Sequence, residues 1–346
     1  MSEKEQTHTP ISNLGEFGLI DQLTRNFSLH HPQSILGIGD DAAVLDFGQQ
    51  KTVVSTDLLM EGVHFDLMYS PFKHLGYKAV IVNLSDIYAM NAQPLQFTFS
   101  IAISSKFTLE ALEALYDGVA TACKHYGVDL IGGDTSNSLS GMAISVTAIG
   151  ITQNYVCRST AQVGDYIVVS GDLGAAYLGL QLLEREKRIF LENPAIQPAL
   201  QEHTYLIERQ LKPEARRDLY EWFKAQNITP TAMIDISDGL SSDILHICKQ
   251  SKVGCVLFED NIPLHPQTIE VARQFNISPT TCALNGGEDY ELLFCINPKD
   301  LSAVENVEGL HIIGKIVDAS EDCHLVSRDG RAHKLIAQGW NALHTK

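Results

Sequence analysis

The chain has 346 residues, of which 45% are hydrophobic, and a formal net charge of −17. That length is typical of about two domains, and the acidic balance disfavours partners such as nucleic acid or an anionic membrane surface. No apolar run approaches the ~20 residues of a membrane span, and the polar start lacks the apolar region of a signal peptide. We therefore expect a cytoplasmic protein with no membrane and no nucleic acid partner.

The first part of the chain alternates between helix-like and strand-like patterns. Apolar spacing predicts helices over 14–30, 73–91 and 108–126, and strands over 34–38, 42–47, 51–56, 95–103, 128–133 and 141–150. In the second part, helices are predicted over 174–189, 199–224 and 237–250, and strands within 163–171, over 231–237, and in ELLFCI and HIIGKIV. The class is α/β or α+β, with predicted domains at 1–150 and 151–346.

Seven cysteines are scattered along the chain, and none of them forms a CxxC pair. Most lie in apolar segments, where a reduced and buried thiol is the expected state. Neither a disulfide framework nor a structural zinc site is indicated.

Two stretches come close to nucleotide-binding motifs. GIGDDA (37–42) matches the loose dinucleotide pattern, but two aspartates occupy the phosphate approach and strand-like segments follow instead of a helix. GLHIIGKI (309–316) resembles a P-loop but ends in Ile where a hydroxyl is needed for magnesium. We therefore do not interpret GIGDDA as a dinucleotide fingerprint, and we interpret GLHIIGKI as a strand.

The stronger signal is a set of aspartates at predicted strand ends or in turns, in GIGDD, VVSTD, VNLSD, LIGGD and MIDISD. Carboxylate oxygens suit Mg²⁺, which also binds phosphate oxygens and can bridge a polyphosphate to an acidic protein. A single aspartate has plainer explanations: Asp238 could cap the next helix, and Asp134 could be a turn residue. Asp86 has no such plain structural explanation, because it interrupts an apolar helix-like stretch, where a carboxylate usually needs a partner.

Three further residues are candidates beside these clusters. His64 follows VVSTD closely, although a lone histidine is more often a surface or core residue. Glu288 comes after two glycines, which permit the close approach of a ligand. Arg158 could bind a phosphate with its guanidinium group or form an ordinary salt bridge.

Six motifs, taken in order and spacing, resemble the thiamine-monophosphate kinase family: GIGDDAAVL, STDLLMEGVHF, KAVIVNLSDIYAMNAQP, LIGGDTS, MIDISDGLSSDI and NGGEDYELLF. The resemblance runs from about residue 14 to Trp340. It implies a two-domain fold like that of aminoimidazole ribonucleotide synthetase, in a homodimer whose N-terminal sheets pair into a barrel. It also implies that ATP and several Mg²⁺ ions are used to convert thiamine monophosphate to thiamine diphosphate.

The resemblance assigns roles to residues of this sequence. It implies metal binding by Asp40, Asp41, Ser55, Thr56, Asp57, Asp86, Asp134, Asp235 and Asp238, with Asp40 the less certain member. It implies nucleotide contacts by Tyr116, Gly133, Asp134, Arg158 and Ser237. It implies substrate contacts by His64, Glu288 and Trp340, whose indole could stack on the cationic ring of thiamine or simply pack.

The acceptor phosphate is mostly dianionic near neutral pH, so direct transfer without a catalytic base or a phosphoenzyme is expected. The segment SGDLGAAYLGL (170–180) departs from the family pattern, because its glycine-rich turn is about one residue shorter. Two alternatives remain open: a sibling ATP-dependent synthetase of the aminoimidazole ribonucleotide or selenophosphate type, and a non-catalytic Mg–nucleotide sensor. The chain has no cysteine before Cys123, whereas selenophosphate synthetases usually carry a reactive one near the N-terminus.

Overall fold

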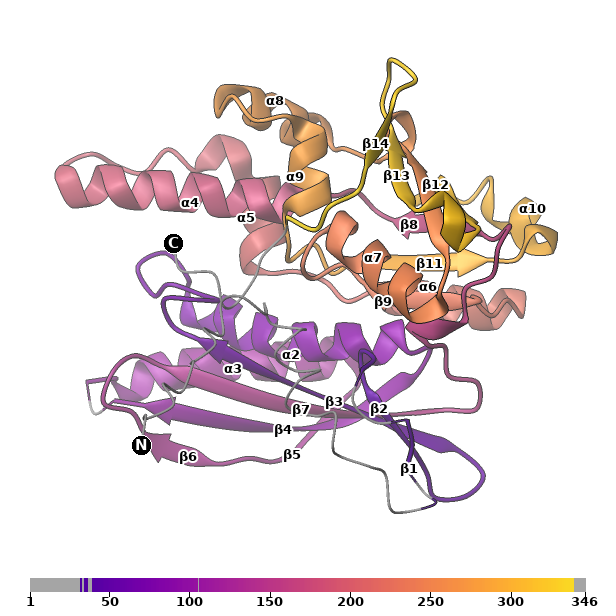
Figure 1. Ribbon diagram of the computed structural model, residues 1–346. Helices are drawn as coiled ribbons and strands as arrows, with labels where there is room; N and C mark the ends of the chain where they lie inside the picture. Colours follow the sequence, from indigo (N-terminus) through magenta and orange to yellow (C-terminus); the bar gives the residue numbers. More distant parts are fainter. Residues whose placement is uncertain (1–31, 33, 37–38, 105, 339–346) are drawn as a thin grey trace, which may run out of the picture.

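The computed structural model describes residues 32, 34–36, 39–104 and 106–338 (Figure 1). The predicted helix over 14–30 and the predicted substrate residue Trp340 lie outside these residues. The described chain contains two mixed sheets, one whose last strand ends at Thr152 and one whose first strand begins at Tyr166. The predicted α/β (α+β) class is confirmed.

The N-terminal sheet has the order β1-β2-β3-β7-β4-β5, and β6 also pairs with β4. Its strands are β1 (Ser34–Leu36), β2 (Ala43–Asp46), β3 (Lys51–Met60), β4 (Gln93–Ile103), β5 (Asp129–Gly132), β6 (Thr135–Asn137) and β7 (Ala143–Thr152). The strands β5 and β6 run parallel to β4, and the other neighbours are antiparallel. Because β2 and β3 form a hairpin directly after GIGDDA, this stretch is not a dinucleotide fingerprint.

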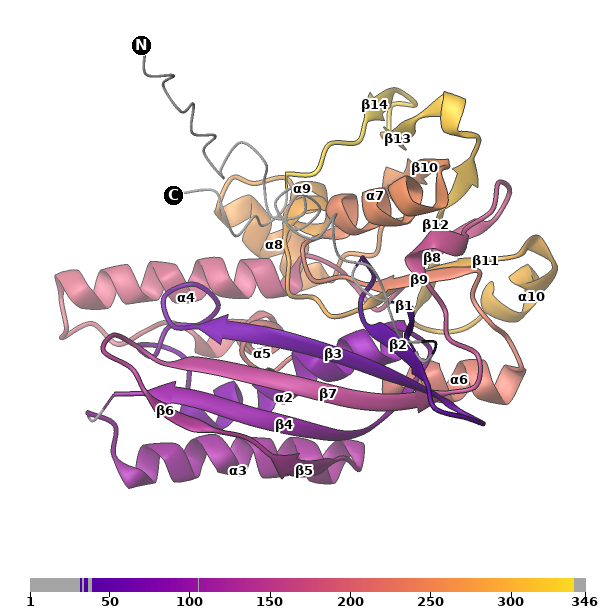
Figure 2. The same ribbon diagram turned by 60° about the horizontal axis from the view of Figure 1, so that its bottom comes forward.

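Two helices, α2 (Phe72–Ala89) and α3 (Leu109–Tyr126), cover one face of this sheet (Figure 2). The Thr108 side chain caps the start of α3, and Gly127, with φ of 70°, ends it in a left-handed conformation. A glycine on each helix permits close packing: a Cβ at Gly76 would lie 1.9 Å from the Leu115 carbonyl oxygen, and one at Gly118 the same distance from that of Lys73.

The C-terminal sheet has the order β14-β13-β10-β12-β8-β11-β9, with only β10 and β13 parallel among its described strands. Its strands are β8 (Tyr166–Ser170), β9 (Ala232–Asp235), β10 (Gly254–Phe258), β11 (Leu292–Ile296), β12 (Leu310–Val317), β13 (Cys323–Val326) and β14 (Ala332–Lys334). GLHIIGKI thus lies mostly in β12 and is no P-loop.

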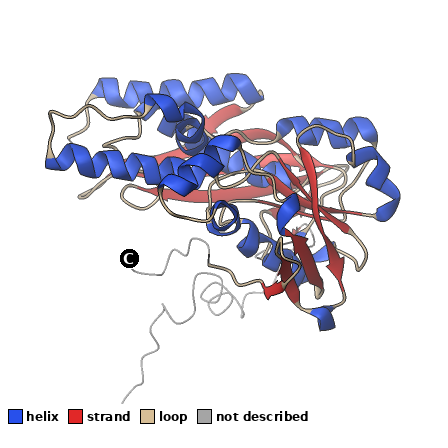
Figure 3. Ribbon diagram, turned by 90° about the horizontal axis from the view of Figure 1, so that it is seen from above, coloured by secondary structure: helices blue, strands red, loops and turns tan. Residues whose placement is uncertain are grey.

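Helices flank both sheets (Figure 3). Those of the C-terminal half are α4 (Ala175–Glu192), α5 (Thr204–Leu211), α6 (Arg217–Gln226), α7 (Leu240–Ser251), α8 (Pro266–Gln274), α9 (Pro279–Asn285) and α10 (Leu301–Val304). The predicted single helix over 199–224 is wrong, because Pro213 lies between α5 and α6, where its ring and missing N–H interrupt a helix. None of the helices in the described ranges combines the length and apolarity that a membrane crossing requires.

The helix α2 connects the two halves of the molecule. It packs on the N-terminal sheet and also faces β9 and α5, and most of its residues are buried around its whole circumference. Its Tyr77 hydroxyl donates to Glu214, and its Lys78 ammonium donates to the Gln210 carbonyl oxygen at 2.9 Å. The acidic residues described next lie where α2 meets both sheets.

Candidate active site

Three carboxylates converge from distant parts of the chain. Asp41 precedes β2, Asp86 lies in the last turns of α2, and Asp235 ends β9. One oxygen from each lies within 4.8 Å of the others, and Asp235 is only 2% exposed. Like charges at this spacing repel one another, so the cluster requires protons or a cation.

Hydroxyl groups hold two of these carboxylates in place. Ser55, on β3, donates to Asp86, and Ser85 donates to an Asp235 oxygen at 2.6 Å. Asp57 lies two residues after Ser55 on the same face of β3, and its backbone N–H donates to Asn83 at 3.1 Å. The predicted residues Ser55 and Asp57 are therefore brought to the cluster.

Burial and repulsion from neighbouring carboxylates raise the pKa values of Asp57, Asp86 and Asp235. Burial, with the charge of Asp41, raises the pKa of Asp57 to about 6 and that of Asp235 to about 8. Burial also raises the pKa of Asp86 well above its usual range, and Asp57, Asp235 and Asp41 add to the rise. A bound cation would reverse these shifts by stabilising the charged carboxylates.

Arg158, in the short helix η2 (Arg158–Thr160), lies against the adjacent aspartates Asp40 and Asp41. Its guanidinium makes a two-pronged contact with Asp41, including an Nε donation at 2.9 Å, and its backbone N–H donates to Asp40 at 3.1 Å. Burial and the charge of Asp41 nevertheless raise the pKa of Asp40 to about 7, although Arg158 opposes the rise. The salt bridge considered for Arg158 is present, and its nucleotide contact stays a prediction.

The segment after β9 contributes Ser237, Asp238 and a further buried acid, Asp243. The N-cap position of α7 is Gly239, with φ of 114°, and Asp238 lies one residue before it. The Asp243 carboxylate accepts from the N–H of Gly239 at 3.1 Å. Burial, followed by the charges of Asp238 and Asp235, raises the pKa of Asp243 well above its usual range.

The glycine-rich loop before β11 packs directly on this segment. The Glu288 N–H donates to the Ser237 carbonyl oxygen at 2.8 Å, and a Cβ added at Gly287 would lie 2.3 Å from that oxygen. Only glycine fits such an approach. Glu288 itself has φ of 65°, and its carboxylate pairs with the Lys78 ammonium at 2.9 Å and accepts from Gln210.

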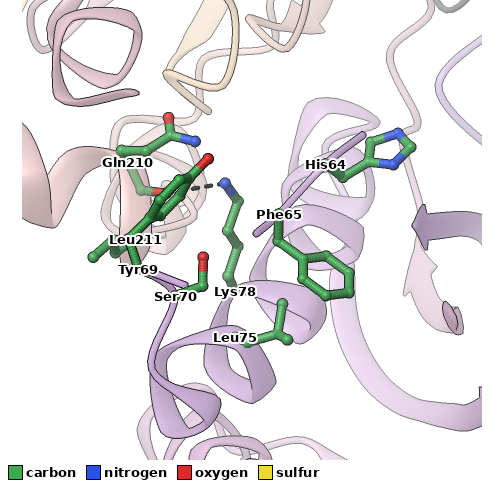
Figure 4. Close-up of a pocket in the computed structure, with 8 residues that line it drawn as sticks. All are labelled: His64, Phe65, Tyr69, Ser70, Leu75, Lys78, Gln210 and Leu211. Carbon is green, nitrogen blue, oxygen red and sulfur yellow. Dashed lines mark hydrogen bonds between the residues drawn. The ribbon is translucent and has the colours of Figure 1, made fainter. Parts of the chain in front are cut away.

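His64 and Lys78 line a small pocket together with residues of the segment between β3 and α2, of α2 and of α5 (Figure 4). In Figure 4 the Lys78 ammonium points toward Gln210, and the His64 ring extends away from it. The His64 Nδ1 accepts from the Met60 N–H at 3.0 Å, and burial lowers the pKa of this imidazole against the opposing charge of Glu288. The His64 ring is therefore neutral near pH 7, and its proton is on Nε2.

Four predicted residues lie elsewhere or have another structural role. Thr56 is on the opposite face of β3, where it donates to the Val146 carbonyl oxygen at 3.0 Å. Asp134 is exposed between β5 and β6, and Gly133 permits that segment to approach the Phe99 backbone, where a Cβ would lie 1.9 Å from the carbonyl oxygen. Tyr116 packs edge-on against Phe99 in the N-terminal core.

Sequence reasoning missed several residues that hold this site together: Lys78, Asn83, Ser85, Gln210 and Asp243. A signal was present for Lys78, which interrupts the same apolar helical stretch as Asp86 and is 4% exposed. A buried lysine requires a partner, just as a buried aspartate does.

Known proteins resemble most of the chain. Residues 39–152 match the family model described as AIR synthase related protein, N-terminal domain. The thiamine-monophosphate kinase of Aquifex aeolicus is 34% identical over 89% of this chain and 97% of its own length. That of Bacillus subtilis is 34% identical over 95% of this chain and 99% of its own.

Solved structures resemble the fold. One described as "AaThiL complexed with AMPPCP and TMP" has a TM-score of 0.82 and 31% identity, and covers 98% of this chain and 100% of that one. Thiamine-monophosphate kinase from Stenotrophomonas maltophilia has a TM-score of 0.71 and 34% identity, and the match covers 92% of this chain and 98% of that one. The hydrogenase maturation protein HypE in complex with ATP shares the fold alone. Its identity is 18% and its TM-score 0.69, and the match covers 96% of this chain and 98% of that one.

Proposed function

The chain belongs to the thiamine-monophosphate kinase family and phosphorylates thiamine monophosphate with ATP, and we propose that its acidic cluster carries out this transfer by holding several Mg²⁺ ions. The observation behind the proposal is the convergence of Asp41, Asp86 and Asp235. Hard oxygen ligands on rigid elements fit Mg²⁺.

The donor set supports magnesium better than a structural role. Burial raises the pKa values of Asp86 and Asp235, Arg158 is the cation that pairs with Asp41, and Ser55 and Asp57 add oxygen atoms beside them. When bound, Mg²⁺ neutralises phosphate charge and holds two phosphate groups in line. Asp40, Thr56, Asp134 and Asp238 remain further proposed metal-binding residues.

The remaining roles are proposed for residues around the cluster. Arg158 exchanges part of its contact with Asp41 for a phosphate oxygen of ATP, and Ser237, Gly133 and Tyr116 contact the nucleotide. Glu288 and His64 contact thiamine monophosphate from the neighbouring pocket, and Trp340 stacks on its ring. The location of Glu288 supports this arrangement, because its loop packs on Ser237 directly after the metal-binding end of β9.

Direct transfer suits these side chains. The acceptor phosphate has a second pKa of about 6, so it is already nucleophilic near neutral pH and needs no base. His64 is neutral and cannot supply a positive charge, so we propose that its Nε2–H donates a hydrogen bond to the acceptor phosphate. No group on the protein is phosphorylated in this mechanism.

We also propose that the two halves of the chain have different roles and that the protein forms a homodimer. Residues 1–150 bind ATP and Mg²⁺ and dimerise, and residues 151–346 complete the nucleotide and substrate site. The uncovered face of the N-terminal sheet supports dimerisation, because no described helix lies on it and Leu58 on β3 is 57% exposed. The edge residue Ile131 on β5 is also 57% exposed.

A turnover assay tests the metal cluster. ADP release is measured with thiamine monophosphate, with thiamine and with buffer alone, and only the first is expected to support turnover. Asp235→Asn is expected to lower kcat by at least about a hundredfold in a folded protein, since it removes charge from the transition-state site. Glu305→Gln, an acid-to-amide change at an exposed position, is the matched control.

Other outcomes distinguish the alternatives. Asp235→Asn with unchanged kcat would contradict the metal cluster. ATP binding without turnover would identify a sensor, and turnover only with a ribonucleotide or selenide would identify a sibling synthetase. Stable label on the protein after incubation with γ-labelled ATP alone would rule out direct transfer.

A further inference from the structure

Three cysteines far apart in the sequence meet in the C-terminal half: Cys248 at the end of α7, Cys255 on β10 and Cys323 at the start of β13. All three are free thiols, and their exposed fractions are 3%, 0% and 6%. Their three sulfur atoms lie within 4.8 Å of one another.

The backbone fixes this arrangement. Cys255 and Cys323 are register partners on the parallel strands β10 and β13, so their side chains leave the sheet on the same face. The Cys255 N–H donates to the Asp322 carbonyl oxygen at 3.2 Å, which ties the two strands together beside the thiols. Helix α7 packs on that face and adds the Cys248 sulfur.

The surroundings favour sulfur as the sole ligand type. The three cysteines belong to an apolar cluster with Ile244, Ile247, Leu257 and other aliphatic side chains. Within the described ranges, the group gains no fourth donor from a His, Cys, Asp or Glu side chain. Such a site disfavours hard ions, which need oxygen ligands, and suits soft ions that bind thiolates.

The sulfur spacing fits a single ion. A metal–sulfur bond of about 2.3 Å places three sulfurs around one ion about 4 Å apart. The thiols need to close by less than about 1 Å from their spacing in this structure, which side-chain rotation supplies.

We propose that Cys248, Cys255 and Cys323 form a binding site for one soft, thiophilic metal ion, separate from the acidic cluster. Each thiol loses its proton to water as its sulfur binds the ion, so three S–H bonds break and three metal–sulfur bonds form. No electron is transferred. The ion joins the last turn of α7 to two strands of the sheet.

Cadmium titration of the full-length, reduced protein tests the site. With excess Mg²⁺ present to occupy carboxylates, Cd²⁺ is expected to produce a thiolate-to-metal absorbance band that saturates at about one ion per chain. Protein loaded first with Zn²⁺, whose thiolate complexes lack this band, is expected to gain the band as the softer Cd²⁺ displaces Zn²⁺. Cys255→Ala and Cys323→Ala are expected to lose the stoichiometric band.

Cys295→Ala is the matched control, because Cys295 is also fully buried in the same sheet, on β11, and outside the group. It is expected to keep the band. Circular dichroism melting shows whether each variant folds.

A second measurement uses the unaltered protein and so does not depend on how the variants fold. Alkylation of each cysteine is followed by peptide mass spectrometry with and without Cd²⁺. Slower labelling of Cys248, Cys255 and Cys323 together, with unchanged labelling of Cys282 and Cys295, is expected. Absence of a saturating band, an unchanged band in Cys255→Ala, or unchanged labelling of the three thiols would overturn the proposal.

Discussion

The ion pair between Lys78 and Glu288 offers a quantitative test of how the two halves of the site are held together. The Lys78 side chain is 5% exposed and that of Glu288 is 26% exposed, and their charged atoms lie 2.9 Å apart. Lys78→Met removes the ammonium and also the donor to the Gln210 carbonyl oxygen. Because Glu288 keeps some access to water, we expect a loss of about 2–3 kcal/mol in the free energy of unfolding.

Removing the charge of the other partner, Glu288, is expected to lower the free energy of unfolding by more than Lys78→Met does. Glu288→Gln leaves the buried Lys78 ammonium without its counter-charge, for which about 3–5 kcal/mol is expected. The double variant should lose less than the sum of the two, with a coupling energy of about 1–3 kcal/mol. Both single variants should raise the KM for thiamine monophosphate, because Lys78→Met releases Glu288 from its partner and Glu288→Gln replaces it.

Urea denaturation at constant pH measures these free energies, and Lys73→Met is the control. Lys73 is exposed in the first turn of the same helix, so its loss should change stability by no more than about 0.5 kcal/mol. A Lys78→Met protein as stable as the parent, or strictly additive single variants, would refute the reasoning.

Three further predictions concern pH, the glycine loop and dimerisation. Since burial raises the pKa of Asp40 to about 7 and that of Asp235 to about 8, the folded metal-free protein holds more protons than the unfolded one between about pH 4 and pH 8. Its Tm in EDTA should therefore fall as pH rises through that window. Added Mg²⁺ should raise the Tm most near the upper pH limit of the window. A Tm that does not change with pH would count against a cluster that holds protons. Gly287→Ala should destabilise the fold by about 2 kcal/mol or more in urea denaturation and lower kcat/KM, since its Cβ would lie 2.3 Å from the Ser237 carbonyl oxygen. Leu58→Asp should shift the mass measured by light scattering from dimer to monomer, and a dimer that persists would remove this sheet face from the interface.

Much of the fold could be predicted from local pattern. The helix over 73–91 and the strands in ELLFCI and HIIGKIV match α2, β11 and β12 closely, because each carries a long apolar run with clear ends. The helix over 199–224 was wrong because its apolar spacing continues across Pro213, and spacing alone does not weigh a missing N–H.

The site could be predicted only in part. Recurring aspartates before β2, on β3, in α2 and at the end of β9 identified the acidic cluster, because each follows from residue type and position. The partners Ser85 and Gln210 could not be predicted, since their contacts with Asp235 and Glu288 span 150 and 78 residues. The three-cysteine group was missed for the same reason: its members are scattered in sequence, and only strand register places Cys255 beside Cys323.

The burial of α2 on all sides has a consequence for how the molecule unfolds. A helix that packs on the N-terminal sheet and also on β9 and α5 belongs to two hydrophobic cores at once. Neither half can lose its structure without exposing apolar surface of the other, so the chain should melt in one calorimetric transition despite its two sheets. An isolated N-terminal fragment would present the bare side of α2 to water and should aggregate, so the two halves form a single unit of folding.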